Sequence, residues 1–106
     1  MTDLKECRQK LDQIDREILE KFTQRMKTVE EIAQYKKENN LPVLDVSRER
    51  EILIWANRNA PEELSLHSVT LFRTLMELSR ARQRDLLNFD GKNSKLIKKK
   101  NYPTNS

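Results

Sequence analysis

The sequence predicts an all-α protein with three helices, the first of them very long. Residues 4–38 contain neither glycine nor proline, and their apolar side chains recur with the period of a helix. The whole chain has one glycine and three prolines among 106 residues, and 36% of its residues are charged. This composition is typical of a helical protein, and the length predicts a single domain.

The first predicted helix would be roughly 50 Å long, about three times the average length in globular proteins. Asp3, followed by Glu6, matches the capping box of a helix N-terminus, and Thr2 is the competing candidate for the cap. Asn39 and Asn40 can adopt the left-handed conformation common at helix C-termini, and Pro42 opposes continuation. The sequence therefore predicts both ends of this helix.

Two shorter helices are predicted after a short extended connector. The second helix covers residues 45–59, with Asp45 or Ser47 as its N-cap and Pro61 as its stop signal. A third helix is expected to have Ser65 as its N-cap and to run to about Leu87. Three helices of such unequal length predict a first helix that is only partly covered.

The net charge of +4 resides at the C-terminal end. Residues 88–106 carry five lysines against one aspartate, whereas residues 1–87 hold 16 cationic and 16 anionic side chains. We therefore predict a helical domain over residues 1–87 and a lysine-rich, disordered tail over residues 88–106. A neutral domain gives no reason to expect nucleic acid as a partner, and no run approaches the ~18 apolar residues of a membrane span. The single cysteine, Cys7, is typical of a cytoplasmic protein.

The apolar residues of the first helix form one stripe along it. At about 100° per residue they fall within about 60° on either side of Leu11. The stripe consists of Leu4, Cys7, Leu11, Ile14, Ile18, Phe22, Met26, Val29, Ile32 and Ala33. Two short helices cannot cover a stripe of this length. We therefore predict an intertwined homodimer, in which two first helices pack antiparallel across a two-fold axis and the shorter helices cover them.

Polar side chains interrupt the predicted interior. Three cations lie in the stripe of the first helix: Arg8, Arg25 and Lys36. Further polar residues are predicted to face the same interior from the other two helices: Asp45, Arg48, Glu49, Ser79 and Gln83. Buried cations require anions, and one glutamate cannot balance Arg25, Lys36 and Arg48. We predict a ligand with two carboxylates, because guanidinium groups bind carboxylates bidentately.

The spacing of the three cations predicts how the ligand site is assembled. Arg25 and Lys36 are about 16 Å apart along the helix, so their side chains can converge on one small molecule. Arg8 is roughly 25 Å from Arg25 and cannot reach the same ligand within its own chain. An antiparallel partner would bring a second Arg8 to the site, so we expect two sites that are shared between the chains.

In these positions the chain resembles the all-helical (type II) chorismate mutases. The resemblance covers residues 4–87 and is clearest in VLDVSRERE, after the first helix, and in Ser79-x-x-x-Gln83. It implies the intramolecular Claisen rearrangement of chorismate to prephenate, a step of the shikimate pathway toward phenylalanine and tyrosine. The reaction needs no metal and no cofactor, so we expect neither.

The resemblance also implies roles for the polar residues. Arg25 and Arg48 of one chain and Arg8 of the other would hold the two carboxylates of chorismate. Lys36 and Gln83 would donate hydrogen bonds to the ether oxygen, which gains negative charge as its C–O bond breaks.

Three further roles are implied by the resemblance. Glu49, together with Lys36, would hold the ring hydroxyl. Ser79 would make a supporting contact, and Asp45 would position Arg48 and the turn before the second helix.

Three other functions fit the same sequence. One is a fused or regulatory mutase domain, in which the lysine-rich tail would begin a linker to a prephenate-processing partner or serve as a docking segment. An isochorismate-pyruvate lyase resembles the mutases in its pocket cations and its substrate, although VLDVSRERE is more similar to the mutase segment. A helical dimer that only binds partners, with the basic tail as a contact surface, would use the same fold without catalysing a reaction.

Overall fold

The structure is a computed structural model that describes residues 3–88. This part of the chain is all-α, as predicted, and contains no strand. Its elements are α1 (Leu4–Glu38), α2 (Val46–Asn59), the short 3-10 helix η1 (Glu62–Leu64) and α3 (Ser65–Asn88). The bounds of α1 are those that the sequence predicts. The predicted tail lies outside the described residues, apart from its first residue, which ends α3.

Both ends of α1 have the predicted caps. The side chain of Asp3 accepts a hydrogen bond from the backbone N–H of Glu6 at 2.8 Å. At the other end Asn40 has a φ of 54°, in the left-handed region. The N–H of Leu41 then donates to the carbonyl of Lys36 at 2.9 Å, the bond that closes a Schellman motif. This turn ends α1 and directs the chain into the connector before α2.

The N-terminus of α2 resolves the choice between two predicted caps. Oδ1 of Asp45 accepts a hydrogen bond from the backbone N–H of Arg48 at 3.0 Å, so Asp45 is the N-cap and Ser47 lies inside the helix. The carbonyl of Asp45 also accepts the first helical bond, from the N–H of Glu49 at 3.0 Å. The cap therefore positions the first turn of α2, which carries Arg48 and Glu49.

The prediction that Ser65 caps α3 is wrong. Ser65 has helical backbone angles, φ −56° and ψ −48°, and it follows the 3-10 helix η1. Pro61 precedes this turn, and its carbonyl accepts a hydrogen bond from the N–H of Leu64 at 2.8 Å. The chain thus becomes helical one turn earlier than the position of the serine suggests, and Pro61, with φ −55° and ψ 142°, is the extended residue before this turn.

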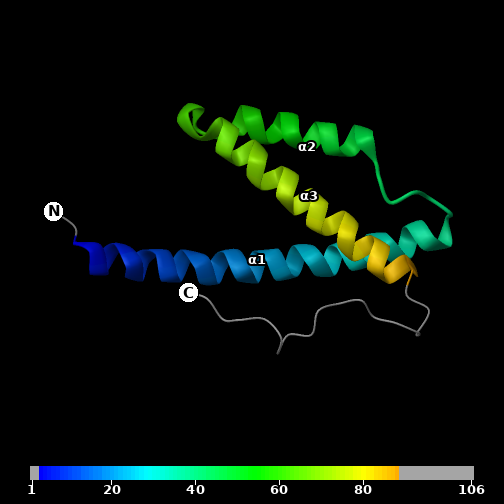
Figure 1. Cartoon of the computed structure of the whole chain (residues 1–106), viewed down its shortest axis with the longest axis horizontal. Helices are drawn as coiled ribbons and strands as arrows, with labels where there is room; N and C mark the ends of the chain where they lie inside the picture. Colours follow the sequence, from blue (N-terminus) through cyan, green and yellow to red (C-terminus); the bar gives the residue numbers. More distant parts are fainter. Residues whose placement is uncertain (1–2, 89–106) are drawn as a thin grey trace.

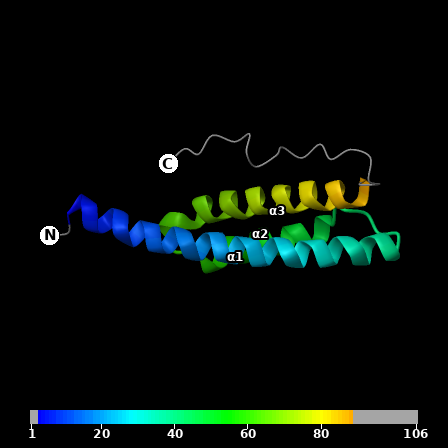
Figure 2. The same cartoon turned by 90° about the horizontal axis from the view of Figure 1, so that it is seen from below.

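The three helices form a thin, open arrangement. Figure 1 shows α3 crossing the C-terminal half of α1, with α2 folded back along α3. The shortest dimension of the molecule is 17 Å, and the slab is seen edge-on in Figure 2. Arg82 of α3 joins α1 through an ion pair with Glu30 at 2.9 Å. None of the described helices combines the length and apolarity of a membrane span.

The N-terminal half of α1 extends away from the other described helices. Every residue from 3 to 21 is exposed, including Leu11, Ile14 and Ile18, which are 55%, 48% and 58% exposed. The apolar side chains that are buried are few and mostly small: Val29, Ala33, Ala56 and Met76. The radius of gyration is 17.2 Å, compared with ~13 Å for a compact domain of about 100 residues. One chain therefore leaves most of its apolar stripe in water.

Candidate active site

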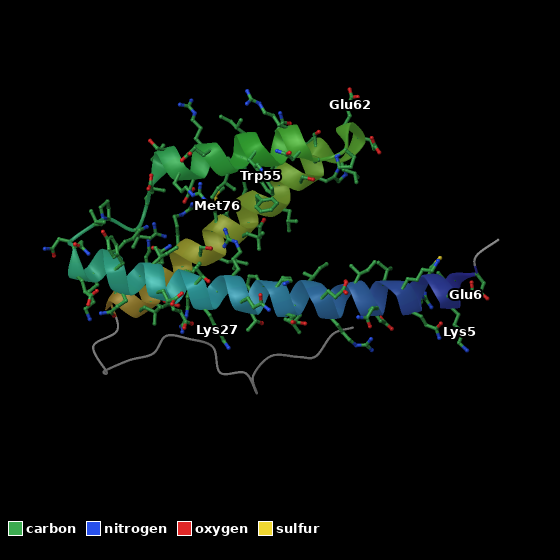
Figure 3. All side chains as sticks on the ribbon, turned by 180° about the vertical axis from the view of Figure 1, so that it is seen from behind. Lys5, Glu6, Lys27, Trp55, Glu62 and Met76 are labelled. Carbon is green, nitrogen blue, oxygen red and sulfur yellow. The ribbon has the colours of Figure 1, made fainter. Side chains whose placement is uncertain are left out.

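A pocket lies where the C-terminal half of α1 meets α2 and α3. Its volume is about 490 Å³, within the range of small-molecule sites. It brings together all but one of the predicted site residues: Arg25, Lys36, Asp45, Arg48, Glu49, Ser79 and Gln83. Apolar side chains form part of the wall, among them Met76 of α3, which Figure 3 labels in the angle between α2 and α1.

Arg8 is the predicted site residue that does not line this pocket. It is exposed, in the N-terminal half of α1. Figure 3 labels Lys5 and Glu6 near the far end of this half, well away from the angle where the pocket lies. The distance along the helix from Arg8 to Arg25 is about 25 Å, so Arg8 cannot reach the pocket of its own chain.

Arg25 joins α1 to α3 inside the pocket. Its Nη1 donates a hydrogen bond to Oγ of Ser79 at 2.5 Å, and Ser79 in turn donates to the carbonyl of Leu75 at 2.8 Å. Burial lowers the pKa of the Arg25 guanidinium. No carboxylate among the described residues pairs with Arg25. A partly desolvated cation with a neutral partner is suited to bind an anion.

Lys36 is held by the connector between α1 and α2. Its Nζ donates a hydrogen bond to the carbonyl of Val43 at 2.6 Å. An ammonium group has three N–H donors, so two remain for a ligand. The contact orients the amine at the pocket wall without neutralising its charge.

Glu49 pairs with Arg80, a residue that the sequence-based prediction missed. Nη1 of Arg80 contacts Oε1 of Glu49 at 2.5 Å and Oε2 at 2.6 Å. Arg80 lies four residues after Met76 and three before Gln83, so it shares the inward face of α3. That spacing could have identified Arg80 as a pocket residue, although it does not show that Glu49 is its partner.

The other polar residues of the pocket differ in how they are engaged. Asp45 caps α2, whereas the guanidinium of Arg48 makes no hydrogen bond or ion pair to another described residue. Gln83 is only 6% exposed, and its Oε1 has no hydrogen-bond partner within the described part of the chain. Arg48 and Gln83 therefore offer polar groups to a ligand.

The charges of the pocket define what it can bind. Its lining within residues 3–88 includes four cations and two carboxylates: Arg25, Lys36, Arg48, Arg80, Asp45 and Glu49. The excess of two positive charges complements a small dianion. In the same described range, no group of three or more His, Cys, Asp or Glu residues is placed to hold a metal ion. The fold and the pocket together define an all-helical protein with a pocket whose charge suits a small dianion.

Comparison with known proteins identifies the family. A model of the family "Chorismate mutase type II" matches residues 7–84, and the chain belongs to this family. Over 52 residues it is 44% identical to the bifunctional chorismate mutase/prephenate dehydratase of Aquifex aeolicus (strain VF5). That match covers 49% of this chain and 14% of the relative, so the chain spans a small part of the relative's length. No solved structure matches the chain.

Proposed function

We propose that this chain is a chorismate mutase, which converts chorismate to prephenate by an intramolecular Claisen rearrangement. The proposal rests on the pocket of this chain, together with its membership of the family. The pocket brings together the polar side chains Arg25, Lys36, Asp45, Arg48, Glu49, Ser79 and Gln83. In this reaction an ether C–O bond breaks while a C–C bond forms in the same molecule. Holding the reacting ends together and stabilising the developing charge are therefore the main contributions that a protein can make.

The cations of the pocket would bind the two carboxylates of the substrate. Arg25 has only the neutral hydroxyl of Ser79 as its hydrogen-bond partner, and the guanidinium of Arg48 makes no hydrogen bond or ion pair with another described residue. Both can therefore turn their donors to a carboxylate without breaking an ion pair. Two guanidinium groups at different helix positions would hold the flexible enolpyruvyl arm over the ring.

Lys36 and Gln83 would stabilise the ether oxygen as its bond to carbon breaks. Lys36 retains two N–H donors beyond its bond to the carbonyl of Val43. Gln83 offers its amide N–H, and the residue as a whole is 6% exposed. Such preorganised donors are worth about 3–4 kcal/mol each in comparable oxyanion sites. Glu49 would accept a hydrogen bond from the ring hydroxyl, close to Lys36.

The active form would be an antiparallel homodimer with Arg8 contributed by the partner. The exposed stripe around Leu11, Ile14 and Ile18 supports this proposal, because isolated chains rarely leave so many large apolar side chains in water. The position of Arg8, too far along α1 to reach its own pocket, supports the shared site.

The proposal is tested by incubating the purified full chain with chorismate and following the loss of chorismate and the appearance of prephenate. We expect turnover without added metal or cofactor, and a loss of about 10²- to 10³-fold in kcat for Gln83→Ala, which removes one donor to the ether oxygen.

The same preparation is incubated with isochorismate, and pyruvate is measured. Pyruvate release without prephenate formation would replace the mutase by a lyase on the same scaffold. A folded protein that converts neither substrate would leave the helical dimer that only binds partners as the remaining function.

A further inference from the structure

Arg80 and Glu49 form an ion pair in the wall of the pocket. One nitrogen of Arg80, Nη1, lies 2.5 and 2.6 Å from the two carboxylate oxygens of Glu49. The side chains are 21% and 24% exposed, and both line the pocket. The pair joins α3 to the first turns of α2, the part of α2 that faces the substrate site.

We propose that Arg80 is a positioning residue for the rearrangement: it holds Glu49 in the pocket wall and keeps the other pocket cations available for the substrate. This inference rests on the proposed function. Arg80 would not contact the substrate itself and would act through the carboxylate of Glu49.

The partners of the other pocket cations support the proposal that Arg80 pairs with Glu49 while the other cations stay available for the substrate. Arg25 donates to a serine hydroxyl and Lys36 to a backbone carbonyl, so neither charge is neutralised by a carboxylate of the described chain. If Arg80 were absent, Glu49 would face Arg25, Lys36 and Arg48 as the remaining cations of the same pocket. A glutamate that paired with one of them would compete with a substrate carboxylate for it.

The geometry of the pair also orients the glutamate. A carboxylate has about four lone-pair directions, and one nitrogen that bridges both oxygens occupies two of them. The remaining directions can accept the ring hydroxyl. Fixing the side chain in advance also removes rotamer freedom that substrate binding would otherwise have to restrict.

The same helix offers a matched control. Arg82 of α3 forms an ion pair with Glu30 of α1, with its Nε and Nη2 at 3.1 and 2.9 Å from Oε2. This pair also joins two helices, but neither residue lines the pocket. Arg82→Gln therefore removes an interhelical ion pair of the same type without touching the site.

The test measures kcat and KM for chorismate, together with the thermal midpoint, in a set of full-chain variants. We expect Arg80→Gln to lower kcat/KM by about 10- to 100-fold, Arg80→Lys to recover part of this loss, and Arg82→Gln to stay within about twofold of the parent. In a Glu49→Gln background, Arg80→Gln should change kcat/KM by less than about threefold, because the group it positions is already altered.

Two results would overturn the proposal. A loss for Arg80→Gln no larger than that for Arg82→Gln would leave Arg80 with a structural role only. An equal loss in the parent and Glu49→Gln backgrounds would mean that Arg80 acts on the substrate or on folding, and not through Glu49.

Calorimetric binding of chorismate to the same proteins separates this inference from the proposed function. If the parent chain binds chorismate but forms no prephenate, the proposed function fails. The role of Arg80 is then decided by comparing the dissociation constants of the parent, Arg80→Gln, Glu49→Gln and the double variant. If the parent neither binds nor converts chorismate, both proposals are overturned.

Discussion

Arg8→Ala and Lys36→Ala chains are each expected to be nearly inactive as homodimers and to regain activity when they are mixed. In the proposed homodimer, each substitution would remove a donor from both sites. After joint unfolding and refolding, heterodimers form. If Arg8 serves the partner's pocket, one site of the heterodimer carries both lesions and the other carries neither. Activity should then return to about half of the parent value per heterodimer.

The measurement is prephenate formation by the refolded mixture, with native mass spectrometry to count heterodimers. The matched control mixes Lys36→Ala with Gln83→Ala, because both residues line the same pocket of one chain and each heterodimer site then carries one lesion. Complete heterodimer formation with activity still at the level of the single variants would refute the shared site. It would also leave the N-terminal half of α1 without a role in the proposed site.

An Ile18→Glu chain is expected to be unable to dimerise and to lose most of its thermal stability. Ile18 is 58% exposed in the single chain and lies near the centre of the apolar stripe, so a dimer would bury it twice. An uncompensated carboxylate buried at such an interface would cost about 3–5 kcal/mol. Sedimentation equilibrium and the far-ultraviolet circular dichroism melt measure both effects.

Gln13→Glu is the control for this variant. It introduces the same charge about 140° around the helix from Ile18, on the face that carries the Gln13–Arg16 hydrogen bond. We expect it to melt within a few degrees of the parent and to remain dimeric. A parent chain that sediments as a fully helical monomer at micromolar concentration would contradict the dimer itself.

The parts of the structure that depend on local sequence were predicted well. The ends of α1 follow from Asp3 and Asn40, whose caps involve backbone groups a few residues away. The inward faces of the helices follow from their period, and seven of the eight predicted polar residues line the pocket, whereas Arg8 does not and Arg80, which also lines it, was missed. The start of α3 was not, because a proline-initiated 3-10 turn formed before the serine that was expected to cap the helix.

Pairing between helices was harder to predict. The period places Arg80 on the inward face of α3 but does not show that Glu49 takes Arg80 as its partner and leaves Arg48 free. That choice depends on how α2 and α3 cross, which no short sequence pattern encodes. The dimer, the role of Arg8 across it and the tail beyond residue 88 stay predictions.

The unpaired amide oxygen of Gln83 implies a trade-off between folding stability and the proposed activity. A buried polar atom without a partner costs about 1–3 kcal/mol of folding free energy. A Gln83→Met chain should therefore melt at a higher temperature than the parent while losing the donor proposed for the ether oxygen. A higher melting temperature together with a lower turnover would mean that Gln83 serves the proposed reaction at a cost in folding stability.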